Sequence, residues 1–360
     1  MIWLAPILGV ALLLTLLRDV YSTVLVPRGQ AGPVTRGLYA GTWSAWRWFG
    51  DRLHGQQRRR WLSLLGPLLV PLTVVMWVTM LVASYALIYY PWAGGFTVSS
   101  SGNQALSAWT KALYVSGYSA TTLGVGDVVP DGVVLRLLIV LEAGHGFILF
   151  SLAVTYLLSI YTALNRSTAL ALEISQFVGR AAGKHPADVL ITMARSGTER
   201  DVLDWLARTA SIMASVAQSE GQYPLLRYFH VPDDDRALPV VLTDLLEIAT
   251  LARSVLSPAH FPAMAEGPVS PMLERLIQHH LHEGVRKLGP DATDGTVLER
   301  ERRESYQAAR QQLEAAGVAV RAEPEAWPAY ARLRAGWDTK NRRIRTRFGY
   351  PECEAHDAGP

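Results

Sequence analysis

Residues 121–127 read TTLGVGD and lie between two long apolar runs, Trp61–Tyr90 and Val133–Ala163. The connection that carries them, 91–132, is apolar enough to enter a membrane but too short and too interrupted to cross it. Ahead of the glycines, Ala105–Ser119 predicts a helix of about half the spanning length. Non-helical backbone at membrane depth is tolerated only where it is buried in protein or lines a water-filled path. The sequence therefore predicts a re-entrant loop between two spanning helices.

The 360-residue chain is 50 % hydrophobic, but its apolar residues are concentrated in the first half. Residues 2–17 form a third apolar run without a positive start or a cleavage site, which favours a retained membrane helix over a signal peptide. This run is shorter than the ~20 residues that cross a bilayer. The helix is therefore expected to continue through Arg18 and Asp19 toward Val26, with the two charges neutralising each other at the interface. Four residues predict an aromatic belt at the far end of the second span: Tyr85, Tyr89, Tyr90 and Trp92.

Arginines between the first and second spans predict the orientation, because loops kept in the cytoplasm carry an excess of Arg and Lys. They are Arg28, Arg36, Arg47, Arg52, Arg58, Arg59 and Arg60. The chain is then expected to be a multi-pass protein of the cell (inner) membrane, with its N-terminus and the 91–132 connection outside and everything after Ala163 in the cytoplasm. Tryptophans at 43, 46 and 48 alternate with Arg47 and Arg52, which indicates a short helix in the inner interface. The alternative is a tryptophan-rich loop packed on protein.

The order of span, half-length helix, T-x-G-x-G-D and second span resembles the pore module of potassium channels, over residues 61–163. The stretch GDVVPDGVVLRLLIVLEAGHG, residues 126–146, is similar without gaps to the outer mouth and inner helix of that family. The resemblance implies an all-α membrane protein, with an extra N-terminal transmembrane helix and a C-terminal helical cytoplasmic domain. It also implies a homotetramer in the lipid bilayer, since one chain has one pore loop and the family closes as four.

The chemistry of such a loop explains its residue types. A potassium ion that enters a narrow pore exchanges its water shell for oxygens, which rings of backbone carbonyls supply. Successive carbonyls face one axis only if alternate residues adopt backbone angles that glycine adopts readily, as Gly124 and Gly126 can. The resemblance implies that potassium is the permeant ligand and needs no other cofactor. The ion-binding residues that it implies are Thr122, Leu123, Gly124, Val125 and Gly126, with the hydroxyl of Thr122 at the inner end.

The residues expected to support this filter by resemblance are Thr121, Asp127, Tyr114, Tyr118 and Glu142. Asp127 would hold the loop by hydrogen bonding behind the outer mouth. Val125 departs from the usual Tyr or Phe, and Tyr118 stands where some members have glutamate, which puts inactivation behaviour in doubt and, to a lesser degree, selectivity. Glu142 and His145 are ionisable residues inside a span, which makes each a functional hypothesis. Glu142 could bond the back of the pore helix or take part in gating, and His145 could contact a neighbouring helix or sense pH.

Gly146 lies at the family's hinge position in the last span. A stripe at helical spacing follows it and could line the inner cavity: Phe147, Phe150, Val154, Leu158 and Thr162. The alternative is that this stripe packs on the preceding helix.

From residue 166 onward the pattern is that of soluble helices. Amphipathic helices are expected around Val202–Val216, Leu238–Val255 and Val297–Ala315. No strand–helix alternation with a G-x-G-x-x-G turn indicates a nucleotide-binding domain. Of the cluster His279, His280, His282 and Glu283, only His279 and Glu283 share a helix face, so a solvated face is expected rather than a metal site. Cys353 is the single cysteine, which excludes a disulfide within the chain.

A basic patch near the end of the chain could contact anionic lipid headgroups, with a solvated or disordered tail as the alternative. It consists of Lys340, Arg342, Arg343, Arg345 and Arg347. The expected division of the chain is 1–60 for the N-terminal helix and basic interfacial segment, 61–165 for the pore module with the filter at 121–127, 166–348 for the cytoplasmic domain, and 349–360 for a polar tail.

Three functions fit the sequence: a gated potassium channel, a non-selective cation pore on the same scaffold, and a non-conducting membrane sensor or scaffold. Catalysis is disfavoured because no nucleophile, base and orienting group stand out, and nothing points to a nucleic-acid partner. Voltage sensing is disfavoured because no span carries arginines at every third position.

Overall fold

The computed structural model describes residues 3–26, 31–53, 55–98, 106–229, 231, 233, 236–285, 295–348 and 350. Arg28, Ala105 and most of the expected polar tail, with Cys353, lie outside these residues. The chain forms two compact units. Unit 1 comprises Met1–Gly50, Leu64–Thr162 and Glu220–Phe229, and unit 2 comprises Asp51–Ser63, Ala163–Ser219 and His230–Pro360.

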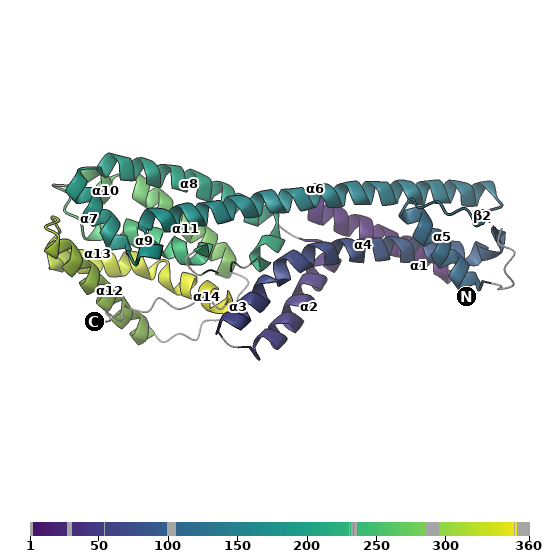
Figure 1. The fold of residues 1–360 in the computed structure, drawn as a ribbon, viewed down its shortest axis with the longest axis horizontal. Coiled ribbons are helices and arrows are strands. Elements are labelled where there is room, and N and C mark those ends of the chain that lie inside the picture. Colours follow the sequence, from purple (N-terminus) through teal and green to yellow (C-terminus); the bar gives the residue numbers. More distant parts are fainter. Residues whose placement is uncertain are drawn as a thin grey trace. The chain divides into compact units, whose positions relative to one another are not determined.

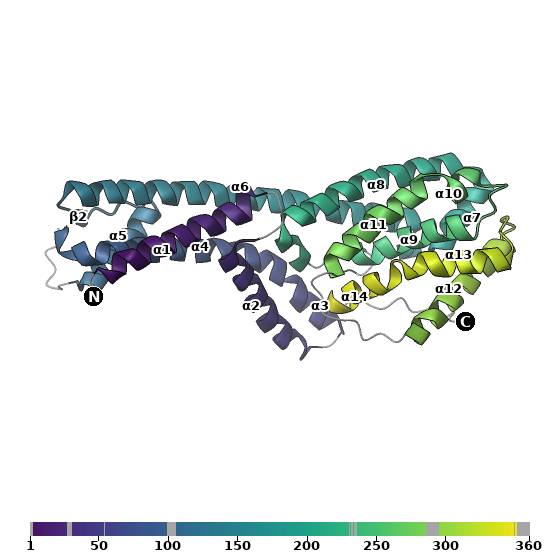
Figure 2. The same ribbon diagram turned by 180° about the vertical axis from the view of Figure 1, so that it is seen from behind.

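Three helical segments in the described chain are long and apolar enough to cross a membrane: Leu4–Leu25, Arg60–Gly95 and Val133–Val178. The first consists of α1 (Leu4–Val20) and a π-helical turn η1 (Tyr21–Leu25), and the second contains α4 (Leu65–Tyr89). Helix α1 packs along α4 (Figure 2). The expected aromatic belt is half wrong, because Tyr85 and Tyr89 are buried inside the unit while Tyr90 and Trp92 are exposed.

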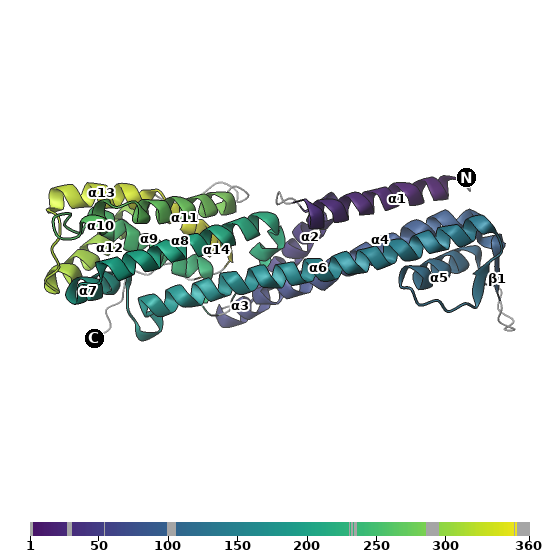
Figure 3. The ribbon, with the colours of Figure 1, turned by 90° about the horizontal axis from the view of Figure 1, so that it is seen from above.

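Helix α6 (Val133–Val178) is one continuous helix, longer than the span of 133–163 expected from the sequence (Figure 3). Neither glycine nor proline occurs between 164 and 178, so nothing stops the helix where the membrane segment ends. Leu170, Ile174 and Val178 give its last turns a face in the core of unit 2. The helix ends at Gly179, which has φ of 78°.

The segment between the first two spans is helical, so the loop alternative is wrong. Helix α2 (Pro33–Gly50) buries Thr35, Tyr39 and Trp43, which are four residues apart and share one face. Trp48 and Phe49 are exposed. A shorter helix, α3 (Gly55–Ser63), precedes α4.

Asp19 does not neutralise Arg18, contrary to the expectation from their adjacency. Asp19 is fully buried, and its Oδ1 accepts hydrogen bonds from the backbone N–H groups of Val34 (2.8 Å) and Thr35 (3.1 Å). Its Oδ2 accepts from Nε1 of Trp77 (3.0 Å). A carboxylate is favoured at a helix N-terminus, where backbone N–H groups lack partners within the helix. Asp19 thus fixes the start of α2 to α1 and α4, while Arg18 is exposed.

One end of unit 1 contains the short elements of the connection 91–132. A 3₁₀ turn η2 (Tyr90–Gly95) leads into β1 (Phe96–Val98), which pairs antiparallel with β2 (Val128–Pro130) so that Thr97 lies opposite Val129. Between the two strands lies α5 (Ala108–Ala120), at whose start Ser107 accepts a hydrogen bond from the Thr110 N–H.

Unit 2 is built around the buried helix α9 (Leu238–Ser254), which contacts α7, α10, α11, α13 and α14 (Figure 1). The helices around it are α7 (Pro186–Ser196), α8 (Glu199–Gln222), α10 (Pro262–Glu266), α11 (Val269–Val285), α12 (Gly295–Ala315), α13 (Glu323–Ala335) and α14 (Asp338–Phe348). Unit 2 also contains the 3₁₀ turn η3 (Arg180–Ala182), while the 3₁₀ turn η4 (Pro224–Tyr228) belongs to unit 1. The three helices expected from the sequence around Val202–Val216, Leu238–Val255 and Val297–Ala315 are present, but the second, α9, is buried on nearly all sides rather than amphipathic. Among the described residues, no three His, Cys, Asp or Glu side chains gather in a way that could hold a metal ion.

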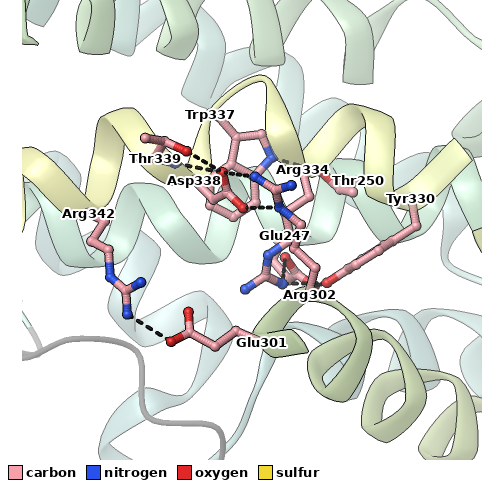
Figure 4. Close-up of polar contacts among 10 residues, drawn as sticks. All are labelled: Glu247, Thr250, Glu301, Arg302, Tyr330, Arg334, Trp337, Asp338, Thr339 and Arg342. Carbon is pink, nitrogen blue, oxygen red and sulfur yellow. Dashed lines mark hydrogen bonds and ion pairs between the residues drawn. The ribbon is translucent and has the colours of Figure 1, made fainter. Parts of the chain in front are cut away.

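Ion pairs tie α14 to its neighbours (Figure 4). Arg302 binds both carboxylate oxygens of Asp338 (2.6 and 3.0 Å), and Arg342 binds Glu301 (2.9 Å). Arg345 is buried. Arg342 and Arg345 therefore lie on a packed helix, and the alternative of a solvated or disordered tail is wrong for these two residues.

Candidate pore site

The half-length helix α5 positions the TTLGVGD loop. Its 13 residues span about 20 Å, well short of a hydrocarbon core of about 30 Å. It packs on α4 and buries Ala112, Val115 and Ser116. The loop leaves the C-terminal end of α5 and continues into β2, which precedes α6.

Every second residue of this loop has a positive backbone φ angle. Thr122, Gly124 and Gly126 have φ of 56°, 59° and 78°, and Thr122 is the one non-glycine residue with positive φ in the described chain. A side chain costs about 1–2 kcal/mol in this region, and a β-branched residue there is an outlier. A Cβ on Gly124 would meet nothing within 4 Å, so backbone angle rather than space requires glycine. Alternation of this kind allows successive carbonyls to face the same side of the chain.

Hydrogen bonds hold the first half of the loop to the end of α5. The N–H of Leu123 donates to the Tyr118 carbonyl (2.8 Å), and the N–H of Thr122 donates to the Ser119 carbonyl (3.0 Å). The Thr121 hydroxyl donates to the Gly117 carbonyl (2.8 Å). The side chains of Leu123 and Val125 are 70 % and 48 % exposed, so within one chain the loop presents an open surface beside these anchors.

Two tyrosines one turn apart on α5 hold the outer half of the loop. The Tyr114 hydroxyl donates to Oδ2 of Asp127 (3.0 Å), and the Tyr118 hydroxyl donates to the Val128 carbonyl (2.6 Å). The two rings meet edge to face with centroids 5.5 Å apart. Tyr118 thus contacts the main chain just after TTLGVGD, from the position where some potassium channels carry glutamate.

Glu142 joins three helices behind the loop. It is fully buried and accepts hydrogen bonds from the Ser116 hydroxyl of α5 (2.5 Å) and the Tyr89 hydroxyl of α4 (2.7 Å). His145, one turn later, lies with Nδ1 at 3.1 Å from the Tyr85 hydroxyl. Sequence reasoning missed Ser116, because a serine within a predicted helix carries no distinct signal, and it assigned Tyr89 to the aromatic belt rather than to Glu142.

Gly146 is a point of close approach between α6 and α5. A Cβ placed on it would lie 2.0 Å from the Ala120 carbonyl oxygen. Helix α6 runs through this position without a break. In this structure the close contact accounts for a glycine here, and the expected hinge stays a prediction.

The stripe on α6 faces away from the rest of its own chain. Phe147, Phe150, Val154 and Leu158 are exposed, as is Thr162. The face that packs on unit 1 instead contains Leu149, Ala153, Tyr156 and Ile160. The alternative that the stripe packs on the preceding helix is therefore wrong.

Comparison with known proteins points to the same region of the chain. Residues 72–163 match the model of a family described as ion channel. The matched stretch contains most of α4, all of α5, the TTLGVGD loop and the membrane part of α6. This match supports an ion channel.

The chain is also similar to the uncharacterized membrane protein YdjJ of Bacillus subtilis (strain 168). The two are 28 % identical over 246 residues, which is 68 % of each chain. No solved structure matches. Together with the three apolar helices of this chain, the similarity fits a multi-pass membrane location.

Proposed function

We propose that this chain is one subunit of a homotetrameric, potassium-selective channel of the cell membrane, with TTLGVGD as its selectivity filter. The observation that carries the proposal is the positive φ at Thr122, Gly124 and Gly126, in a loop anchored at both ends. The ion channel match over 72–163 supports conduction, and the alternating backbone supports potassium as the ion.

Four loops around one axis would bind potassium with main-chain oxygens. Thr122, Leu123, Gly124, Val125 and Gly126 supply the carbonyls, and Thr122 adds its hydroxyl at the inner end. Each chain contributes one loop, so a closed ring of oxygens needs several chains. The exposed side chains of Leu123 and Val125 then face other subunits rather than water.

The surrounding hydrogen bonds set how firmly the loop is held. Asp127, Tyr114 and Tyr118 support its outer half, while Thr121 and Glu142 support the end of α5. Val125 lacks the ring that the family usually has here, so it contributes no aromatic contact of its own. We expect this to change how long the filter stays conductive, not which ion it prefers.

The stripe on α6 is proposed to line the inner cavity, with the N-terminus of the chain outside and unit 2 in the cytoplasm. Exposure of Phe147, Phe150 and Leu158 supports the lining, because apolar side chains that no part of their own chain covers are available to a shared cavity. The arginines between the first two spans support the orientation. Unit 2 is proposed to act as a gating domain.

Potassium flux from liposomes that contain the purified full chain tests conduction. The proposal expects flux that barium blocks. Absence of flux from protein that inserts and assembles would favour the non-conducting sensor or scaffold instead. Equal flux of sodium and potassium would favour the non-selective pore.

A further inference from the structure

One segment of unit 1 is separated in the sequence from the rest of that unit by a long stretch of unit 2. Glu220–Phe229 comprises the last residues of α8 and the turn η4, and it is separated from the rest of unit 1 by Ala163–Ser219. Helix α8 therefore begins in unit 2 and ends in unit 1. Turn η4 contacts α4, and both of its leucines, Leu225 and Leu226, are buried.

The C-terminal end of this segment is held by α2 and α4. The Tyr228 ring lies 5.9 Å from the Tyr39 ring and 5.6 Å from the Trp43 ring, between centroids. A Cβ on Gly66 would lie 2.7 Å from the Phe229 ring and 2.8 Å from the Phe229 Cα. The segment is thus in direct contact with the α4 backbone, at the start of the second span.

Both ends of the segment converge on one residue of α6, Tyr156. The Tyr223 ring meets the Tyr156 ring edge to face, with centroids 6.0 Å apart. From the other end, Tyr228 contacts Tyr39, whose hydroxyl lies 3.4 Å from the Tyr156 hydroxyl. Tyr39 and Tyr156 are 3 % and 2 % exposed, so neither can shift without displacing its neighbours.

Tyr156 also contacts a residue of α4 that is itself held by a hydrogen bond. Its ring contacts Trp77 of α4 with centroids 6.1 Å apart, and Nε1 of Trp77 donates to the buried Asp19. Because Asp19 also holds the start of α2, the residues that receive the segment belong to one connected set across α1, α2, α4 and α6.

We propose that Glu220–Phe229 is a second link through which unit 2 acts on α6, besides the continuation of α6 itself into unit 2, with Tyr156 as the residue that receives the movement. This rests on the proposed channel function. Val154 and Leu158 of the stripe lie two residues to either side of Tyr156 on the same continuous helix. A rigid helix that moves at Tyr156 carries these side chains with it. Coupling between two parts of a protein is reciprocal, so release of the segment must change α6, and a change in α6 must change the segment.

The test uses the full chain with Tyr223→Ala, Tyr228→Ala and the milder Tyr156→Phe, which removes only the hydroxyl contact with Tyr39. Trp48→Ala is the matched control, because it removes an exposed aromatic side chain from the same helix that holds Tyr39. Two quantities are measured: barium-sensitive potassium flux in liposomes, and hydrogen exchange of α6 over 150–162.

Tyr223→Ala and Tyr228→Ala are each expected to change flux by about fivefold or more and to speed exchange in 150–162, whereas Trp48→Ala changes neither. Tyr156→Phe should shift both in the same direction by a smaller factor. Tyr228→Phe keeps the ring and should resemble the wild type. This comparison distinguishes an effect of the lost ring contact from a general loss of folding.

Flux that stays at the wild-type level in both alanine variants overturns the proposal, whether or not exchange changes. If the wild-type chain conducts no potassium, the channel proposal fails and exchange alone decides the link. Faster exchange in 150–162 then supports it, and exchange confined to α2 and the released segment overturns it.

Discussion

Gly144 and Gly146 flank His145 in the sequence GHG, yet the structure gives them different surroundings. A Cβ on Gly144 would meet nothing within 4 Å, while one on Gly146 would lie 2.0 Å from the Ala120 carbonyl oxygen. Gly146→Ala must push α6 away from α5, at a cost of about 1–3 kcal/mol in the stability of unit 1. We expect a lower melting temperature in detergent for Gly146→Ala and no loss for Gly144→Ala. Equal melting of the two variants would contradict this packing.

Asp244 of α9 is expected to make the stability of unit 2 fall as pH rises, which is the reverse of the usual effect of a paired carboxylate. Burial raises the pKa of Asp244 from 3.8 to about 6, although Arg180 binds both of its oxygens (2.7 and 2.8 Å) and opposes the shift. A carboxyl group whose pKa is higher in the folded state contributes stability that is fully present below pH 3.8 and is lost as pH rises through about 6. The expected loss is on the order of 3 kcal/mol between these limits.

The measurement is the melting temperature of the full chain between pH 4 and 7, for the wild type, Asp244→Asn and the exposed control Asp204→Asn. The difference in melting temperature between the wild type and Asp244→Asn should change across this pH range. The melting temperature of the control should follow that of the wild type. Parallel curves for all three proteins would show that Asp244 does not titrate there.

Single residues were the least predictable part of the molecule. The glycines of TTLGVGD could be assigned from sequence, because few residue types tolerate positive φ. The role of Asp19 could not, because a carboxylate beside an arginine suggests a local pair. Its partners, Val34, Thr35 and Trp77, are distant in sequence and contribute two backbone N–H groups that no sequence pattern marks.

Among the elements, α6 shows what periodicity can and cannot establish. The spacing of Phe150, Val154 and Leu158 defines one face of a helix, and the structure shows that this face is not covered by its own chain. The sequence could not give the length of the helix, because the residues after Ala163 continue it as a soluble, amphipathic helix. A composition change marks where the surroundings change, not where a helix ends.

The stripe can be tested with cysteines at Phe150, Val154 or Leu158 in a Cys353→Ser background. Thiol reagents applied from the cytoplasm should modify each of them and block current. The buried Leu149, on the opposite face, is the control and should not react. Leu157 is 37 % exposed and is unsuitable as a second control. Equal modification at Leu149 and Leu158 would contradict the face assigned to the cavity.

At the scale of the whole molecule, the division of the chain into an apolar part and a charged part could be predicted from the sequence. The apolar and charged halves could be separated by composition near Arg166. The return of Glu220–Phe229 to unit 1 could not be foreseen, because its aromatic residues, Tyr223, Tyr228 and Phe229, have neither helical nor strand periodicity. Partners brought together by tertiary packing leave no local pattern.

Truncation after residue 165 tests whether the residues that follow it affect gating without affecting ion preference. It removes every part of unit 2 that follows residue 165, and with it the segment that contacts Tyr39 and Tyr156. We expect a lower melting temperature for the truncated chain and an altered open probability, because α6 loses a contact. Ion preference should stay the same, since the filter backbone belongs to unit 1. A truncated chain that conducts sodium as well as potassium would show that unit 2 shapes the filter.

The most direct measurement is the reversal potential of the full chain in a bilayer with potassium on one side and sodium on the other, for the wild type, Gly124→Ala and the control Gly37→Ala. Gly37 is exposed on α2, and a Cβ there would meet nothing within 4 Å. The wild type and the control should reverse at a large voltage that is negative on the potassium side, because potassium ions carry nearly all of the current. Gly124→Ala, at φ of 59°, should lose selective current while still inserting, because the strain of about 1–2 kcal/mol is repeated in each subunit. Selective potassium current of normal size through Gly124→Ala, or a wild-type reversal potential near zero, would contradict the carbonyl filter.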